Sequence, residues 1–345
     1  MAATATRRDW RHAGPFRDAQ PVAGAHGGAI DPAAFVDDDG TPYLFWGQFH
    51  ARGARLRDDL TAIVPETLNQ SLINEADHGF HEGASVRKRD GVYYLVYADI
   101  GRGRPTALGY ATASTPLGPY TKRGIIVDNA GCDPETWNNH GSIAEVDGRW
   151  YVFYHRSSQN SRYNRRLCIE PIEFTADGSI PEVPMTTGGV ERPLDARRFM
   201  DASRACIVRG GLFAAPVRAP ELPDASASPA IASVAIPEPP HEVLTHTTDG
   251  GEACYRYYDF REETNFSCLA SSATYGGTIE IRLDAADGDL LGSCTVEPTG
   301  DWGRFARTDC EIRPVSGVHE LWLVFRTGRG RSPGRLVDVL GFWFA

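Results

Sequence analysis

One hairpin pattern occurs three times in this chain and limits what it can fold into. Each copy has a short extended run, a tight turn that contains glycine, and a second run rich in aromatic and β-branched residues. The turn glycines, Gly40, Gly91 and Gly148, lie 51 and 57 residues apart. A period near 50 residues built on aromatic hairpins is typical of β-propeller blades. The three copies cover residues 30–47, 79–99 and 140–155.

Each copy opens on a polar residue: Asp31, Glu82 or His140. In a propeller the innermost strand of every blade faces one central channel, so we expect these three side chains to share one site. Glu82 could instead be a solvated carboxylate at a strand end, Asp31 part of an ordinary Asp-Pro turn, and His140 a hydrogen-bonded core residue. An acid in aromatic surroundings, as the nearby Phe80 indicates for Glu82, would stay protonated and could deliver a proton at neutral pH.

The C-terminal part has a different pattern. After a linker-like stretch at residues 188–193, alternating strands separated by Gly and Asp turns become clear from Ala253 onward. Helical periodicity is weak throughout, so we predict an all-β protein. Residues 1–192 are expected to form a partial β-propeller of about three blades, and residues 193–345 a β-sandwich or jelly roll.

Composition narrows the partners and the redox chemistry. The net charge of −10 argues against nucleic acid and anionic membranes, and a neutral polysaccharide is compatible with it. No apolar run reaches the length that spans a membrane. The seven cysteines form no CxxC pair, which argues against a metal–thiolate site. Cys294 and Cys310 lie in strand-like runs and either pair in an oxidising compartment or stay free.

The first half resembles glycoside hydrolase family 43. The resemblance is carried by the runs from Asp31-Pro32 to Gly47, from His81-Glu82-Gly83 to Tyr97, and from Trp137-Asn138-Asn139-His140 to His155. From about Phe199 onward the chain is similar to a family 6 carbohydrate-binding module, best at residues 257–260, 273–284 and 300–302. The resemblance implies a five-bladed propeller that acts on xylan, arabinoxylan or arabinan, followed by a sugar-binding sandwich.

Residue roles follow from the resemblance. It implies that Glu82 is the general acid of an inverting glycosidase, and that Asp31 is the carboxylate that tunes the pKa of Glu82. It implies that His140 is an axial histidine beside a water or a structural calcium, with no cofactor required for the reaction. Among aromatic residues, Trp302 is the best candidate for sugar contact in the module, Tyr255 is a weaker one, and Phe80 is a candidate beside the acid.

The sequence differs from the family pattern at the general base. An inverting enzyme needs a third carboxylate, which the family places on a blade upstream of the middle Asp. Only 30 residues precede Asp31, and they hold two acids, Asp9 and Asp18. We therefore expect a truncated chain that keeps three blades and lacks the base. The alternatives are that Asp31 is itself the base, or that the chain is an inactive remnant that only binds carbohydrate.

The expected location follows from the N-terminus. Residues 1–10 contain no apolar segment of the kind that a signal peptide needs. The chain as given is therefore expected in the cytoplasm, and its full-length parent outside the cell or in the periplasm.

Overall fold

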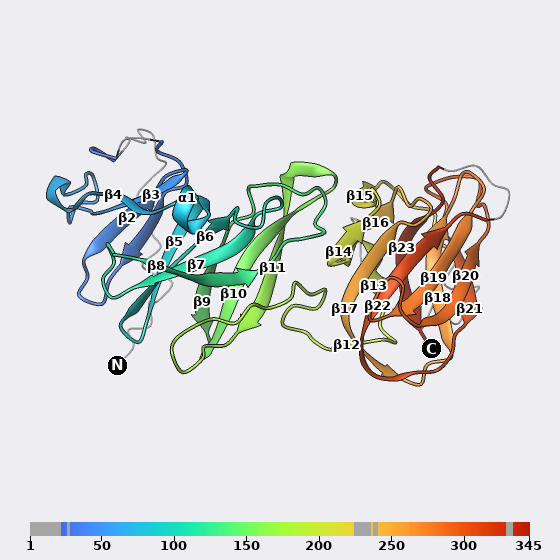
Figure 1. The fold of residues 1–345 in the computed structure, drawn as a ribbon. Coiled ribbons are helices and arrows are strands. Elements are labelled where there is room, and N and C mark those ends of the chain that lie inside the picture. Colours follow the sequence, from blue (N-terminus) through green and yellow to red (C-terminus); the bar gives the residue numbers. More distant parts are fainter. Residues whose placement is uncertain (1–21, 26–27, 224–235, 237–240, 329–333) are drawn as a thin grey trace.

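The protein is almost entirely β-structure (Figure 1). The computed structural model describes residues 22–25, 28–223, 236, 241–328 and 334–345. Asp9 and Asp18 therefore lie outside the described residues. One four-residue α-helix, α1 (Glu75–His78), and two single 3₁₀ turns are the helical elements of the described part. None of these helices is long and apolar enough to cross a bilayer.

The first half consists of three antiparallel sheets that follow one another along the chain (Figure 1, blue to green). Within each sheet, neighbours in sequence are neighbours in space, which is the up-and-down order of propeller blades. The first sheet contains β1 (Ala33–Val36), β2 (Pro42–Trp46), β3 (His50–Arg55) and β4 (Asn69–Asn74). The second contains β5 (Phe80–Arg89), β6 (Val92–Asp99), β7 (Ala107–Ala113) and β8 (Thr121–Val127), and the third contains β9 (Gly141–Val146), β10 (Arg149–Ser158) and β11 (Ser161–Ile172).

All three hairpins that the sequence predicts are present, as the pairs β1–β2, β5–β6 and β9–β10. The second and third turn through Asp90-Gly91 and Asp147-Gly148. Both residues of each turn have positive φ, from 49° to 77°. Two consecutive positive φ values define the hairpin turn whose twist matches the flanking strands, and Asp-Gly is a favoured pair there. These local signals fix where each hairpin reverses.

The second half is a sandwich of two six-stranded sheets (Figure 1, yellow to red). β12 (Leu194–Asp195), immediately after the linker-like stretch, already pairs with a sandwich strand, β17 (Glu252–Arg261). One sheet contains β12 (Leu194–Asp195), β14 (Ile207–Arg209), β17 (Glu252–Arg261), β19 (Gly277–Leu283), β20 (Leu290–Val296) and β22 (Ser316–Arg326). The other contains β13 (Met200–Asp201), β15 (Phe213–Val217), β16 (His241–Thr245), β18 (Asn265–Ser271), β21 (Ala306–Glu311) and β23 (Asp338–Phe344).

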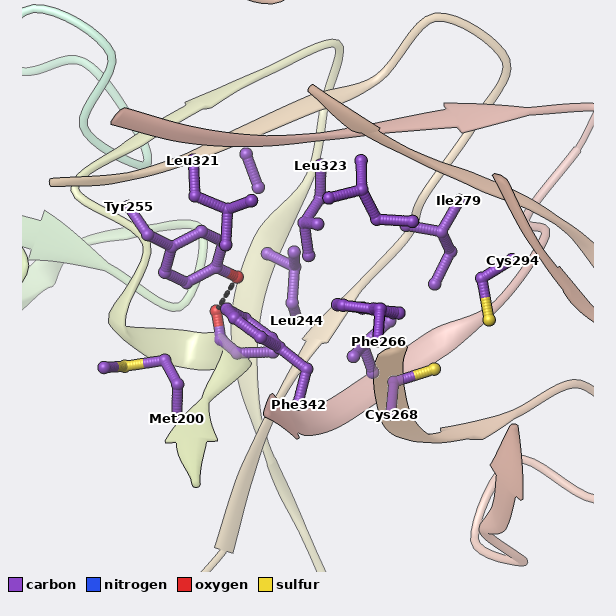
Figure 2. Packing of buried hydrophobic residues seen from close by; sticks show 14 of the residues in the cluster. Met200, Leu244, Tyr255, Phe266, Cys268, Ile279, Cys294, Leu321, Leu323 and Phe342 are labelled. Atoms are coloured by element: carbon purple, nitrogen blue, oxygen red, sulfur yellow. Dashed lines mark hydrogen bonds between the residues drawn. The ribbon is translucent and has the colours of Figure 1, made fainter. Parts of the chain in front are cut away.

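The sandwich core decides the role of one predicted sugar contact. Tyr255 on β17 has no exposed surface, its ring lies 4.8 Å from that of Phe342, and its hydroxyl donates a hydrogen bond to the carbonyl oxygen of Ala202 (Figure 2). A ring enclosed in this way offers no face to a sugar. The prediction that Tyr255 binds substrate is therefore wrong. Trp322 and Trp343, which the strand-like sequence around them favours as core residues, are each 4% exposed.

Candidate active site

The residues that open the three hairpins lie together. Asp31 immediately precedes the first sheet, Glu82 is on β5, and His140 immediately precedes β9. Their ligand-type oxygen and nitrogen atoms all lie within 4.8 Å of one another. Three residues separated by 51 and 58 positions in sequence thus form one cluster. This is the arrangement that blades around a shared axis produce.

Hydrogen bonds hold Glu82 at the centre of this cluster. Its side chain is 8% exposed. Nε2 of His140 lies 3.0 Å from Oε1 of Glu82, and Nε2 of Gln48 donates to Oε2 at 3.0 Å. Nε2 of His140 is also 3.8 Å from Oδ2 of Asp31, an oxygen that is buried without a hydrogen-bond partner. The imidazole therefore lies between two carboxylates and orients the more buried one.

The backbone around Glu82 is irregular, and this irregularity allows His140 to approach Glu82 closely. The register between β5 and β6 shifts on both sides of Glu82. The next residue, Gly83, has a φ of 74°, and a Cβ atom there would come within 3.0 Å of the His140 ring. Glycine is therefore required twice at this position, for its backbone conformation and for the close approach of His140.

The two carboxylates differ in their pKa values. Burial raises the pKa of Asp31, and the neighbouring Glu82 charge adds to this, while the charges of His140 and Arg165 oppose it. Burial also acts to raise the pKa of Glu82, but the hydrogen bond and charge of His140, helped by His81 and Gln48, outweigh it and leave the pKa below its ordinary value. The sequence-based expectation that aromatic surroundings keep Glu82 protonated is not what this arrangement produces.

Phe80 is the aromatic residue on which that expectation rested. It has no exposed surface and packs into the core beside Tyr97, with ring centres 5.6 Å apart. It contributes to the stability of the second sheet, and it has no free face for a sugar. The prediction that Phe80 binds substrate is therefore wrong.

Sequence reasoning missed two residues that support the cluster. Gln48 holds the second oxygen of Glu82. His155 accepts the backbone N–H of His140 through Nε2 at 3.1 Å, and burial, with the charges of Arg165 and His140, lowers its pKa to about 4. His155 is therefore neutral at physiological pH and free to accept. Gln48 follows the end of β2 and His155 lies within β10, but both stand just after the aromatic run of a hairpin, so the repeat pattern contained a signal for them.

The side chains of Asp31, Glu82 and His140 do not by themselves form a calcium site. Calcium takes about six to eight oxygen ligands, and His140 offers nitrogen. Two buried atoms here lack a partner within the described residues: Oδ2 of Asp31 could accept from a water or bind an ion, whereas Nδ1 of His155, which carries the ring proton when Nε2 accepts, could only donate to a water. A calcium here would take most of its ligands from water.

Trp302 lies apart from this cluster, in the sandwich half. It is partly exposed, and the guanidinium of Arg335 lies 3.8 Å from its ring centre. That contact covers one face of the indole. Sugar binding by Trp302 stays a prediction.

Comparison with known proteins gives the cluster its context. Residues 2–180 match the profile of glycosyl hydrolases family 43, which is just over half of the chain. The chain belongs to glycoside hydrolase family 43. Residues 230–345 match the profile of the family 6 carbohydrate-binding module. The family assignment agrees with the resemblance in all three hairpins.

Individual relatives extend over most of the chain. A xylosidase/arabinosidase of Thermoclostridium stercorarium is 28% identical over 86% of this chain and 67% of its own length. An arabinoxylan arabinofuranohydrolase of Bacillus subtilis is 30% identical over 87% of this chain and 61% of its own length. A crystal structure of a family 43 arabinoxylan arabinofuranohydrolase from Bacillus subtilis, in complex with cellotetraose, covers 92% of this chain at 27% identity and a TM-score of 0.48. The chain spans about two thirds of the length of these relatives or less.

Proposed function

We propose that this chain hydrolyses O-glycosidic bonds of arabinose- or xylose-containing plant polysaccharide with inversion of configuration. The observation that carries the proposal is the convergence of Asp31, Glu82 and His140 from three blades, in a chain of family 43. The names of its relatives, which are xylosidases and arabinofuranohydrolases, support the substrate class. Glu82 is the general acid and protonates the leaving glycosidic oxygen.

The separation of the two carboxylates limits the role of Asp31. In inverting glycosidases the acid and the base are about 6.5–9.5 Å apart, because a water must fit between them. Asp31 and Glu82 approach within 4.8 Å, which is too close for that pair. Asp31 is therefore assigned as the residue that modulates the pKa of Glu82. The base is then a third carboxylate, further from Glu82 than the 4.8 Å over which this cluster extends.

Proton delivery requires a change at Glu82. In this structure His140 and Gln48 both engage the carboxylate, and the pKa of Glu82 is low. We infer that the glycosidic oxygen takes the place of one of these partners when substrate binds, and that Glu82 becomes protonated next to an ionised Asp31. A like charge at this distance disfavours a second negative charge, so an ionised Asp31 raises the pKa of Glu82.

The test is turnover of methyl α-L-arabinofuranoside and methyl β-D-xyloside, whose alkyl leaving groups need a proton, by the full chain, with the anomer of the released sugar followed by proton NMR. We expect turnover, with inverted sugar as the first product. Glu82→Gln should remove the activity, and Glu66→Gln, at an exposed position, should leave it unchanged. Retained configuration would make Asp31 a nucleophile, and no turnover above Glu82→Gln would rule out the hydrolytic proposal.

A second candidate function is carbohydrate binding without catalysis. It is favoured by the match of residues 230–345 to a carbohydrate-binding module. Affinity electrophoresis in arabinoxylan separates this function from the first. Retardation that Trp302→Ala abolishes, in a chain without turnover, would favour it, and equal mobility of the two proteins would exclude binding through Trp302.

A further inference from the structure

The sandwich contains three cysteines that converge from three strands. Cys268 is on β18, Cys294 on β20 and Cys310 on β21. Cys268 and Cys294 have no exposed surface, and Cys310 is partly buried against the same core. Figure 2 shows Cys268 and Cys294 on the two facing sheets, at one end of the packed core. All three are free thiols in the structure.

The edges of the two sheets meet where these cysteines lie. β20 ends one sheet and β21 ends the other. The amide of Arg313 donates to the carbonyl of Leu291 at 2.8 Å, and a Cβ atom on Gly292 would lie 2.7 Å from the carbonyl oxygen of Glu311. These contacts run antiparallel. If the offset set by Arg313 and Leu291 is extended by three residues, it places Cys294 opposite Cys310, and the two side chains interact with each other.

We propose that Cys294 and Cys310 form a disulfide that joins β20 to β21 and so links the two sheets of the sandwich. Cys310 is the thiol that an external disulfide reaches first, because Cys294 is fully buried. Cys268 is the third thiol of the group, and it contacts Cys294 in the core.

The chemistry is thiol–disulfide exchange with a low-molecular-weight disulfide as oxidant. The Cys310 thiolate attacks that disulfide and releases one thiolate. The Cys294 thiolate then attacks the Cys310 sulfur and releases the second. The balance is two cysteine thiols and one small disulfide converted to one protein disulfide and two small thiols.

The surroundings set the pH dependence of this exchange. Hydrogen bonding to Cys294, together with burial, raises the pKa of Cys310. Hydrogen bonding to Cys268, together with burial, raises the pKa of Cys294, although the contact with Cys310 opposes this shift. Because the thiolate is the nucleophile, oxidation should be slow at neutral pH and faster as the pH rises.

The experiment exposes the full reduced chain to oxidised glutathione at pH 7 and pH 9, alkylates the remaining thiols and digests the protein with trypsin. The three cysteines fall on separate peptides, residues 262–282, 283–304 and 308–326. We expect the second and third to be joined, faster at pH 9, with residues 262–282 alkylated. The oxidised chain should unfold at a higher temperature than the reduced chain, because a cross-link restricts the unfolded state.

Variants keep the assignment falsifiable. Cys310→Ser should abolish the joined peptides, while Cys168→Ser, which removes a partly buried thiol from the propeller half, should leave them unchanged. A product in which residues 262–282 are joined to 283–304 in the wild-type chain would overturn the pairing. So would full alkylation of all three peptides, or glutathione retained on Cys310 with no internal link.

Discussion

At the scale of single residues, the contact between His140 and Glu82 controls the protonation state on which the proposed chemistry depends. The imidazole lowers the pKa of a carboxyl group that burial alone would raise. Asp31, which has a buried oxygen without a partner, has its pKa raised instead. In the substrate-free protein the surroundings therefore favour the protonated form of Asp31 and the ionised form of Glu82, each relative to the ordinary behaviour of that group.

His140→Gln tests this account through the pH profile. A general acid works only while it is protonated, so activity is lost as the pH rises through the pKa of Glu82. Removing the imidazole removes the interaction that lowers this pKa, so the alkaline limb of kcat/KM should move to higher pH, although the rate at the optimum falls. A limb that moves to lower pH, or does not move, would contradict the assigned interaction. His50→Gln, which removes a histidine that bonds to Ser71 on the same sheet as Gln48, is the control.

Local sequence predicted part of the site and missed part for physical reasons. The leading residues were found because the hairpin turns fix the register of each blade. Phe80 and Tyr255 were assigned wrongly, because strands buried on both sides do not reveal which side chains face a cavity. Register shifts next to both residues, after Phe80 and between Tyr255 and Tyr258, further change the alternation. Gln48 was missed because its contact with Glu82 joins two different sheets.

At the scale of the element, the conformation of β5 next to Glu82 depends on Gly83. Gly83→Ala adds a methyl group at positive φ and within 3.0 Å of the His140 ring. Gly91→Ala is the matched control, because its φ of 77° is similar and nothing lies within 4 Å of its Cβ position. The backbone strain should cost about 1–2 kcal/mol in each variant.

The clash should distinguish these two variants in urea unfolding and in activity. Gly83→Ala should lose more stability than Gly91→Ala and should also lose turnover, because His140 is displaced from Glu82. Gly91→Ala should keep the activity of the wild-type chain. Equal losses of stability, with activity kept in both, would show that the close approach of His140 to Gly83 has no functional role.

At the scale of the whole molecule, the two halves are joined by buried polar contacts. Arg156 on β10 donates to the carbonyl oxygens of Cys206 at 2.5 Å and Ala205 at 2.6 Å. Asp133 accepts hydrogen bonds from the amides of Ala214 on β15 and Asn160. Because these groups come from both halves, we expect the described propeller sheets and the sandwich to unfold as one cooperative unit.

Asp133 makes this junction sensitive to pH. Burial raises its pKa to about 6, although the two amides oppose the shift. Between pH 4 and pH 6 the unfolded chain has released this proton and the folded chain keeps it, so stability falls as the pH rises through this window. The loss is at most about 3 kcal/mol for a shift of about two units.

Asp133→Asn should remove this slope. The free energy of unfolding of Asp133→Asn minus that of the wild-type chain should increase from pH 4 to pH 6 and then level off. Asp58→Asn, whose side chain is 93% exposed, should show no such change. A constant difference between Asp133→Asn and wild type across the window would contradict the raised pKa.

The central claim is that Glu82 protonates the leaving group, and the dependence of rate on the leaving group tests it most directly. A good leaving group needs no proton, so Glu82→Gln should keep most of its kcat/KM on a 2,4-dinitrophenyl glycoside. On arabinoxylan or an alkyl glycoside the same variant should lose about 10²–10⁴-fold, the usual contribution of a general acid. An equal loss on all of these substrates would contradict the claim and would leave Glu82 with a structural role only.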